Sequence, residues 1–295
     1  MKIVLTGGTG FLGSNLVQKL LTSNFEVVVL KRSFSNIDRL LPVIDHPNLK
    51  FFDLDTGDVE VVFVKNDVDC IVHTATEYGR HGSTVHQVLE TNLVYPIKLI
   101  ELGIKYGVKS FINTDSYFNK ENFRYTHLLH YSLSKRSLVQ WLKGLSEKIR
   151  VVNVVLEHLY GPGDDPTKFV GSMIQNIAVN QVSRIGLTYG HQKRDFIFVD
   201  DASDAYVILL GNLNGITAKF SEFPLGTGIS LPVRTLVETI KAISNSSTEL
   251  GFGDIDYRSD EIMDSKADIS GLADLGWFPK VSLNDGVDRT FRSCL

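Results

Sequence analysis

Residues 2–13 read Lys2-Ile3-Val4-Leu5-Thr6-Gly7-Gly8-Thr9-Gly10-Phe11-Leu12-Gly13, a short apolar run followed by glycines at every third position from 7 to 13. The run over 2–6 predicts a buried strand, and residues 11–22 predict a helix. Gly7 and Gly10 permit a turn that a pyrophosphate can approach closely, and Gly13 permits close packing of helix on strand. The N–H groups that begin the helix favour an anion. This stretch therefore predicts a dinucleotide site, with contacts from Thr6, Gly7, Gly10, Phe11, Leu12 and Gly13.

Strand and helix patterns continue to alternate through the first half of the chain. Further strands are predicted at 26–30, 50–52, 70–73, 110–114 and 151–156, and helices at 85–106 and 133–144. Such alternation indicates a parallel sheet covered by helices on both faces, with right-handed crossovers. We therefore expect an α/β protein: a doubly wound parallel-sheet Rossmann fold with a smaller, interleaved C-terminal substrate-binding lobe.

The alternation breaks after Gly161-Pro162-Gly163, and a further strand and helix pair follows at 194–210. No Pro/Gly-rich linker or repeat separates two halves of the chain. We expect a cofactor-binding Rossmann domain over residues 1–160, with 193–212 returning to it. The substrate lobe is then expected to comprise 161–192 and 213–295.

Composition narrows the class of partner. The 295 residues carry a formal net charge of −4, which argues against nucleic acid or an anionic membrane as partner. No apolar run approaches the ~20 residues that span a bilayer, and Met1 leads into a strand without a secretory signal pattern. Cys70 and Cys294 are the only cysteines, so no disulfide is expected. We expect a cytoplasmic protein without a metal site.

The second predicted strand ends in Lys31-Arg32-Ser33. An NAD site usually has an acid at this point for the ribose 2′-hydroxyl, whereas cations attract the 2′-phosphate of NADP. The sequence therefore favours NADP(H), while two solvated cations at a strand end would leave NAD(H) possible. Further cofactor contacts are expected from residues that follow strands at the same edge of the sheet: Asp53, Leu54, Thr74, Ala75 and Thr76.

Tyr131-Ser132-Leu133-Ser134-Lys135 places a phenol and an ammonium four residues apart, on one face of a helix. A free phenol titrates near ~10 and is a reluctant acid or base at neutral pH. An adjacent ammonium and a cationic nicotinamide favour the phenolate. We therefore expect the pKa of Tyr131 to fall toward the working range.

These motifs, together with His73-Thr74-Ala75, Tyr160-Gly161-Pro162, Arg194-Asp195-Phe196 and Leu275-Gly276-Trp277, resemble the extended short-chain dehydrogenase/reductase superfamily. Within it, the chain is similar to the nucleotide-sugar epimerase/dehydratase family. The resemblance implies that Tyr131 is the acid/base, that Lys135 holds the nicotinamide ribose and that Thr114 hydrogen-bonds the reacting sugar oxygen. It also implies that Asn92 lies at the cofactor site and that Arg194 and Arg258 bind the substrate diphosphate, although a surface arginine also fits position 258.

Thr114-Asp115-Ser116 departs from the related 4,6-dehydratases, which carry Asp-Glu after the threonine. Ser116 cannot serve as that base, so dehydration is disfavoured. Tyr78-Gly79-Arg80 and Glu157-His158 resemble the CDP-abequose and CDP-paratose synthase group of 4-keto reductases. The resemblance implies substrate contacts from Tyr78, Arg80, Asp115, Ser116 and His158. A packing histidine at 158 and a loop-capping arginine at 80 remain open.

The sequence thus predicts NADPH-dependent reduction of the C4 ketone of a nucleotide-linked 4-keto-6-deoxyhexose or 3,6-dideoxyhexose, for surface polysaccharide biosynthesis. The nucleotide could be CDP, dTDP or GDP. An NAD-dependent 4-epimerase and a non-catalytic NADP-sensing protein are the alternatives. A homodimer is expected through the helices that flank the cofactor, although the same leucines and isoleucine could face the sheet: Leu89, Leu93, Ile97, Leu138 and Leu142.

Overall fold

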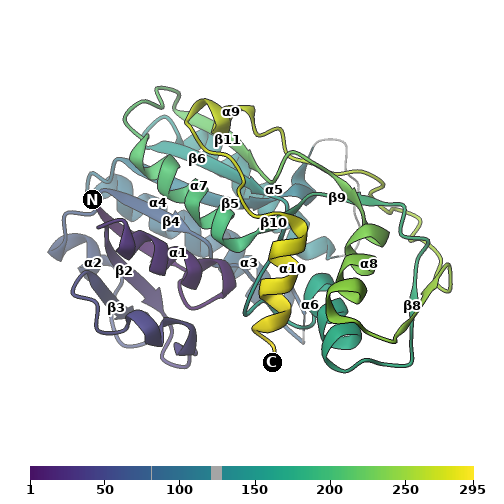
Figure 1. The fold of residues 1–295 in the computed structure, drawn as a ribbon. Coiled ribbons are helices and arrows are strands. Elements are labelled where there is room, and N and C mark those ends of the chain that lie inside the picture. Colours follow the sequence, from purple (N-terminus) through teal and green to yellow (C-terminus); the bar gives the residue numbers. More distant parts are fainter. Residues whose placement is uncertain (81, 121–127) are drawn as a thin grey trace. The chain divides into compact units, whose positions relative to one another are not determined.

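Seven strands form the main sheet of the computed structural model, which describes residues 1–80, 82–120 and 128–295. Their order is β3-β2-β1-β4-β5-β6-β11 (Figure 1). The pairs β1–β2, β1–β4, β2–β3 and β4–β5 are parallel. The strands are β1 (Lys2–Thr6), β2 (Glu26–Lys31), β3 (Leu49–Asp53), β4 (Cys70–His73), β5 (Ser110–Ser116), β6 (Arg150–Leu156) and β11 (Phe220–Leu225). This is the doubly wound α/β fold that the alternating pattern predicts.

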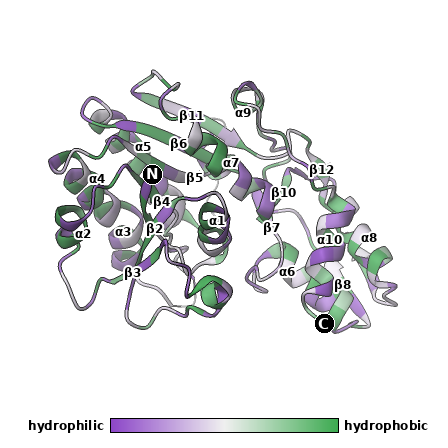
Figure 2. Cartoon of the chain, turned by 60° about the vertical axis from the view of Figure 1, so that its left-hand side comes forward, coloured by the Kyte–Doolittle hydropathy of each residue, from purple (hydrophilic) through white to green (hydrophobic). Residues whose placement is uncertain are grey.

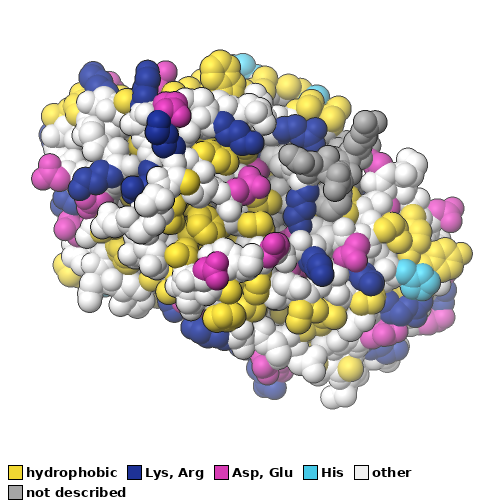
Figure 3. All heavy atoms as spheres, turned by 90° about the horizontal axis from the view of Figure 1, so that it is seen from above, with side chains coloured by type: hydrophobic (Ala, Val, Ile, Leu, Met, Phe, Trp, Pro, Cys, Tyr) yellow, Lys and Arg dark blue, Asp and Glu magenta, His cyan; other side chains and the backbone are white. Residues whose placement is uncertain are grey.

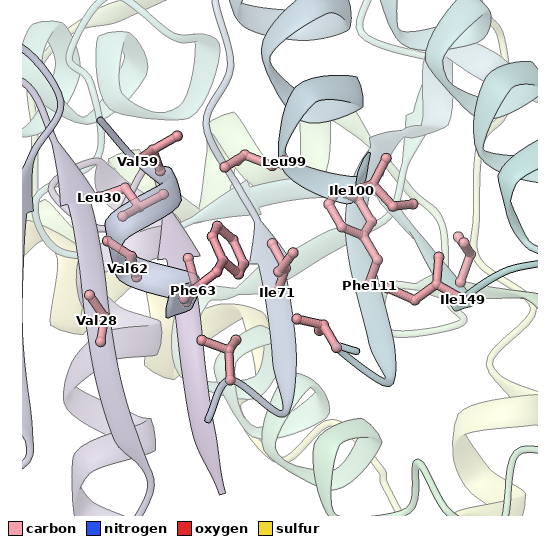
Figure 4. Packing of buried hydrophobic residues seen from close by; sticks show 14 of the residues in the cluster. Val28, Leu30, Val59, Val62, Phe63, Ile71, Leu99, Ile100, Phe111 and Ile149 are labelled. Atoms are coloured by element: carbon pink, nitrogen blue, oxygen red, sulfur yellow. The ribbon is translucent and has the colours of Figure 1, made fainter. Parts of the chain in front are cut away.

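One face of the sheet is covered by α2 (Glu60–Lys65), α4 (Tyr95–Lys105) and α5 (Leu129–Leu145). Figure 4 shows Phe63, Leu99 and Ile100 from these helices packed against Ile71 and Phe111 of the strands. The opposite face is covered by α1 (Phe11–Thr22), and Figure 2 shows it on the other side of the sheet from α2 and α4. Because both faces are covered, the strands are continuous apolar runs rather than alternating ones.

The helix expected over 85–106 is interrupted. It consists of α3 (Val85–Leu89), a π-helical segment η2 (Glu90–Val94) and α4. Thr84 caps α3: its hydroxyl accepts from the Gln87 N–H, and the Gln87 side chain accepts from the Thr84 N–H. The π-helical turn contains Asn92, which is fully buried. Turns of this kind occur often at functional sites.

The chain divides into two compact units with boundaries other than those expected. The first contains residues 1–155 and 206–223, and the second contains 156–205 and 224–295. Residues 156–160 and 193–205 thus lie in the second unit, because β7 (His158–Tyr160) pairs with β10 (Phe196–Phe198) rather than with the main sheet. Residues 213–223 lie in the first unit, because β11 is a strand of the main sheet beside β6.

The second unit contains three two-stranded sheets: β7 with β10, β9 (Lys193–Arg194) with β12 (Leu231–Pro232), and β8 (Arg184–Leu187) with β13 (Glu249–Phe252). Helix α8 (Val233–Ser244) packs against α10 (Leu283–Arg292) and the π-helical segment η4 (Ile174–Val179). The remaining helices of the described residues are η1 (Asp38–Val43), η3 (Tyr117–Asn119), α6 (Phe169–Met173), α7 (Val199–Gly211) and α9 (Ser270–Asp274).

Charges are mixed on the surface. On the face drawn in Figure 3, Lys and Arg side chains are interspersed with Asp and Glu, in keeping with a net charge of −4. An anionic ligand must therefore be held by a local group of cations or by backbone N–H groups. Among the described residues, no helix combines the length and the apolarity that crossing a membrane requires.

Candidate active site

Two glycines at the loop between β1 and α1, Gly7 and Gly13, have no room for a side chain. Gly7 has φ +70°, and a Cβ there would lie 2.5 Å from the backbone nitrogen of Ala75. A Cβ on Gly13 would lie 2.1 Å from the carbonyl oxygen of Gly7. Both glycines are therefore required by close backbone approach, as the spacing predicts.

The first residues of α1 are Phe11, Leu12 and Gly13, and Gly10 is the residue that precedes the helix. The Gly10 N–H donates to the Gly7 carbonyl at 2.9 Å, which closes the turn. Gly10 has no side chain that could cap the helix, and no side-chain cap is present. A helix start of this kind, reached by a glycine turn, fits the pyrophosphate of a dinucleotide.

The ends of β1 and β4 are joined by side chains. The Thr6 hydroxyl lies 2.8 Å from Nδ1 of His73 and accepts from the Ala75 N–H at 3.3 Å. The Thr74 hydroxyl donates to the Thr6 carbonyl at 2.7 Å. Thr6, Thr74 and Ala75 therefore fix the loop edge beside the glycine turn.

At the end of β2, Lys31 and Arg32 differ in environment. Lys31 Nζ lies 3.4 Å from Oδ2 of Asp53, which also accepts from the Ser33 hydroxyl at 2.8 Å. The Asp55 N–H and the Ser33 hydroxyl lower the pKa of Asp53, and Lys31 adds to this effect. Arg32 is exposed, with its guanidinium 5.7 Å from the centre of the Phe34 ring. Lys31 is thus already paired with an anion, and Leu54 continues this edge by donating its N–H to the Lys31 carbonyl at 2.8 Å.

Asn92 joins the loop after β4 to α5. Its amide nitrogen donates to the Glu77 carbonyl at 2.8 Å and to the Ser134 hydroxyl at 3.0 Å. Its amide oxygen accepts from the Glu77 N–H at 2.8 Å and from the Thr76 hydroxyl at 3.4 Å. Asn92 therefore positions Thr76 and the loop, and its own amide is occupied by protein partners.

Tyr131 lies in the first turn of α5, since the helix begins at Leu129 rather than at 133. Its ring is 5% exposed and stacks on Tyr78 with centres 4.9 Å apart, while Phe118 meets it edge-on at 6.2 Å. The guanidinium of Arg80 lies 5.6 Å from the centre of the Tyr78 ring. Tyr131 is thus held in an aromatic pocket bordered by an arginine.

Burial raises the pKa of Tyr131 well above its ordinary value, and Tyr78 adds to the rise; hydrogen bonds with Ser116 and Thr76 act in the opposite direction. The phenol is therefore protonated at neutral pH. The expected fall in pKa depends on a bound cationic nicotinamide; in the protein without cofactor, removal of the phenol from water is the largest effect.

Lys135 is also buried, with 2% exposed, and its Nζ donates to the Thr114 carbonyl at 2.9 Å. Burial lowers the pKa of Lys135 to about 8, and Asp115 opposes the change. Asp115 in turn accepts from the side-chain amides of Asn119 at 2.6 Å and Asn153 at 3.2 Å. Burial raises the pKa of Asp115 to about 6, and Lys135 limits the rise.

Thr114 meets this site through its backbone rather than its hydroxyl. The hydroxyl forms a buried hydrogen bond of 2.6 Å with the Tyr206 hydroxyl of α7. The hydroxyl of Ser116, at the last position of β5, is hydrogen-bonded to Tyr131.

Three substrate-binding residues are expected in the second unit: His158, Arg194 and Arg258. The strand of His158 pairs with the strand that follows Arg194. Arg194 is 7% exposed; its guanidinium pairs with Glu261 and donates to the carbonyl oxygens of Lys193 and Ile262. His158 lies on β7, beside the strand that follows Arg194. Arg258 is exposed, and its carbonyl accepts from the Glu261 N–H at 3.1 Å.

A family model and individual relatives both match this chain over most of its length. The model of the NAD dependent epimerase/dehydratase family matches residues 3–219. CDP-abequose synthase of Salmonella muenchen is 32% identical over 98% of this chain and 96% of its own length. A putative UDP-glucose 4-epimerase of Methanocaldococcus jannaschii is 28% identical over 97% of this chain and 96% of its own length.

Solved structures share the fold. UDP-glucuronic acid 4-epimerase of Bacillus cereus, solved with UDP-glucuronic acid and NAD, has a TM-score of 0.82 at 22% identity, over 99% of this chain and 98% of that chain. UDP-glucose 4-epimerase of Thermotoga maritima, solved with UDP-glucose, has a TM-score of 0.81 at 24% identity, over 100% of this chain and 98% of that chain.

Proposed function

Because the chain belongs to the NAD dependent epimerase/dehydratase family, we propose that it reduces the C4 ketone of a nucleotide-linked 4-keto-6-deoxyhexose with NADPH. The observation that carries the proposal is the Ser116 hydroxyl beside a buried, protonated Tyr131. A hydroxyl at 116 can orient a sugar oxygen but cannot remove a proton as the dehydratase glutamate would. The pair therefore supports reduction over dehydration.

Reduction of a ketone requires a hydride and a proton, and a reduced nicotinamide supplies the hydride when bound. Tyr131, a phenol that is protonated at neutral pH, supplies the proton. Ser116 holds the carbonyl oxygen beside the phenol, a role that the sequence assigned to Thr114. Lys135 holds the nicotinamide ribose, and its contact with the Thr114 carbonyl fixes its ammonium next to β5.

The cofactor is NADP(H) in this proposal, bound by the first unit. The glycine turn and the start of α1 bind the pyrophosphate, and the edge from Asp53 to Leu54 receives the adenine. Arg32 is the cation for the 2′-phosphate, because Lys31 is already paired with Asp53. NADPH and the two free cysteine thiols fit a cytoplasmic enzyme.

The substrate is a CDP-linked 3,6-dideoxyhexose ketone, a choice supported by the 32% identity with CDP-abequose synthase over nearly the whole chain. Tyr78 and Arg80 contact the sugar from the loop after β4, and Asp115 lies next to Ser116. Arg194, Arg258 and His158 of the second unit contact the diphosphate. Abequose-type products would serve surface polysaccharide biosynthesis.

A 4-epimerase is the second candidate, since relatives and solved structures of similar fold include UDP-sugar 4-epimerases. An epimerase needs NAD that stays bound and is regenerated, whereas the exposed Arg32 at the end of β2 favours an exchangeable NADPH and supports the reductase. A non-catalytic NADP sensor is disfavoured because the Tyr131 and Lys135 pair is intact.

Consumption of cofactor separates these functions. A reductase oxidises one NADPH per sugar, which the absorbance of NADPH measures with CDP-4-keto-3,6-dideoxyglucose, alongside dTDP- and GDP-linked 4-keto-6-deoxyhexoses. Oxidation with only a dTDP- or GDP-linked ketone would keep the reaction and discard the CDP assignment. No oxidation, together with conversion of UDP-glucose to UDP-galactose, would replace the reductase by the epimerase.

We also propose that the protein forms a homodimer, through interface residues that only partly match those expected from the sequence. Leu138 and Leu142 are fully buried in the core, and Leu93 and Ile97 pack against it, so these four face the sheet. Leu89 is 41% exposed. The exposed apolar residues of α3 and α5, two helices in contact, are instead Val85, Leu89, Leu129, Leu133 and Trp141.

A further inference from the structure

Glu157 and His158 of the second unit form a pair in which only one member reaches the surface. The Glu157 side chain is 0% exposed, and both its oxygens receive the Ser265 hydroxyl, at 3.0 and 2.9 Å. Nδ1 of His158 lies 3.9 Å from Oε2 of Glu157, and 19% of the His158 side chain is exposed. The Glu157 carboxylate is therefore buried beside the His158 imidazole, and only the imidazole is accessible to a ligand.

The strand that carries His158 pairs with the strand that follows Arg194. The backbone N–H of His158 donates to the Asp195 carbonyl at 3.0 Å, and β7 pairs His158 with Phe196 of β10. The His158 ring meets the Phe196 ring at 5.7 Å, so the neighbouring strand fixes its orientation. Arg194 is two residues before Phe196, and its charge acts on the imidazole. A permanent cation, itself paired with Glu261, therefore acts on this titratable group.

Four influences act on the charge of His158. Burial and the Arg194 guanidinium disfavour the imidazolium, whereas Glu157 and Asp195 favour it; burial is the largest effect and the pKa of His158 is lowered. The Asp195 carboxylate itself accepts from the Thr227 N–H at 2.7 Å and from the Gly228 N–H at 2.9 Å. In the free protein at neutral pH, the imidazole is therefore neutral.

A diphosphate bound to Arg194 would change this balance. Glu261 already pairs with the Arg194 guanidinium in the free protein. The diphosphate adds its negative charge to those of Glu157 and Asp195, so three anionic groups then act on the imidazole and favour the imidazolium. We propose that His158 takes up a proton when the substrate diphosphate binds, so that the site holds the anion with two cations instead of one. This inference rests on the proposed function, which assigns the diphosphate to Arg194.

The consequence is a substrate affinity that depends on pH. Proton uptake on binding makes the affinity rise as the pH falls through the pKa of His158 in the complex, and the rise ends below its lower pKa in the free protein. One proton gives at most a tenfold change in affinity per pH unit, because a factor of ten corresponds to one unit. Oxygens of a diphosphate diester keep a constant charge in this range, so the ligand does not contribute.

Isothermal titration calorimetry of CDP-glucose, with NADP⁺ present, tests the proposal. CDP-glucose has no ketone to reduce. Titrations at pH 7 in buffers of different ionisation enthalpy give the number of protons taken up. We expect uptake approaching one proton for the wild type and near zero for His158→Asn and His158→Gln. The matched control His191→Asn, an exposed histidine of the same unit, should keep the wild-type uptake.

Binding without proton uptake in the wild type would overturn the proposal, as would unchanged uptake in both His158 variants. Either result would leave the reductase function intact, because NADPH oxidation is measured separately. Failure of the wild type to bind CDP-glucose would overturn the diphosphate site, and if no nucleotide-linked ketone is reduced either, it would also overturn the proposed function.

Discussion

Lys135 donates a hydrogen bond of 2.9 Å from its ammonium to the carbonyl oxygen of Thr114, and the ammonium is almost fully buried. The contact joins α5 to β5 at the position that precedes Asp115 and Ser116. A buried ammonium is unfavourable unless it is paired, which is why the pKa of Lys135 falls to about 8. The residue is thus positioned for function in a way that lowers the stability of the fold.

We expect Lys135→Met to raise the melting temperature at pH 7 by several degrees while abolishing turnover. A lysine in the unfolded chain has a pKa of about 10.4, whereas burial lowers the pKa of Lys135 in the folded protein to about 8. The charged ammonium therefore destabilises the folded protein in full below about pH 8, and this penalty disappears as the pH rises from about 8 to the unfolded-state pKa. The gain from Met should therefore shrink as the pH rises from 7 toward 10. Thermal unfolding across this range checks the prediction, with exposed Lys148→Met as control. A variant less stable than the wild type at pH 7 would contradict it.

Tyr131→Phe should lower kcat by about 10²–10⁴-fold, the contribution of a positioned proton donor. The ring and its stacking on Tyr78 are kept, so the dissociation constant for NADPH and the melting temperature should change little. Steady-state kinetics and cofactor titration measure both effects. Tyr106→Phe, which changes a tyrosine outside the site, is the control, and near-normal turnover of Tyr131→Phe would show that another group donates the proton.

Ser116→Ala should mainly affect kcat, whereas Thr114→Val should mainly affect the free energy of unfolding. Loss of the Ser116 hydroxyl removes a partner of the Tyr131 phenol and should lower kcat by about tenfold, the value of one hydrogen bond. Thr114→Val keeps the volume but removes the partner of the Tyr206 hydroxyl, so it should lower the free energy of unfolding by about 1–3 kcal/mol with little effect on kcat. A normal kcat for Ser116→Ala with a large loss for Thr114→Val would restore the assignment made from the sequence.

The sequence was sufficient for six of the seven strands of the main sheet, all except β11, and for the glycine turn. Apolar runs and glycine spacing are local signals, so β1, α1 and β4 match the predicted bounds. Membership of the family, predicted from motifs, is confirmed by the family model over residues 3–219. It was harder to predict which hydroxyl at the end of β5 acts on the sugar oxygen. Thr114 and Ser116 both carry one, and only the family resemblance favoured Thr114. Alternation along β5 does not separate the two either, because positions 114 and 116 lie on the same face of a regular strand.

Other features depend on contacts far apart in the sequence. Tyr206 meets Thr114 across 92 residues, and Asn153 meets Asp115 across 38, so no local pattern indicates either pair. The pairing of Lys31 with Asp53 joins two adjacent strands and could not be read from Lys31-Arg32 alone. The domain boundaries shift for the same reason, since strand pairing decides which segments belong together.

Leu133→Glu should convert a dimer of 32.9 kDa chains into monomers. Leu133 is 51% exposed on α5, where Leu129 and Trp141 continue the same apolar stripe at spacings of four and eight residues. A charge buried in such an interface is strongly unfavourable. Sedimentation equilibrium gives the mass, and exposed Lys98→Glu on α4 is the control. A monomeric wild type, or a dimer that survives Leu133→Glu, would remove α5 from the interface.

Arg32→Ala should remove most of the preference for NADPH over NADH, whereas Lys31→Ala should remove little of it. Arg32 is exposed at the end of β2, while Lys31 is held by Asp53 at 3.4 Å. Loss of a charged hydrogen bond to the 2′-phosphate costs about 1.5–3 kcal/mol, a factor of about 10–150 in the dissociation constant of NADPH. NADH, which lacks that phosphate, should bind both variants as it binds the wild type. Fluorescence titration of each cofactor measures the ratio. Equal affinities of the wild type for the two cofactors would reject the NADP assignment, and a larger effect of Lys31→Ala than of Arg32→Ala would show that Lys31 leaves Asp53 to bind the phosphate.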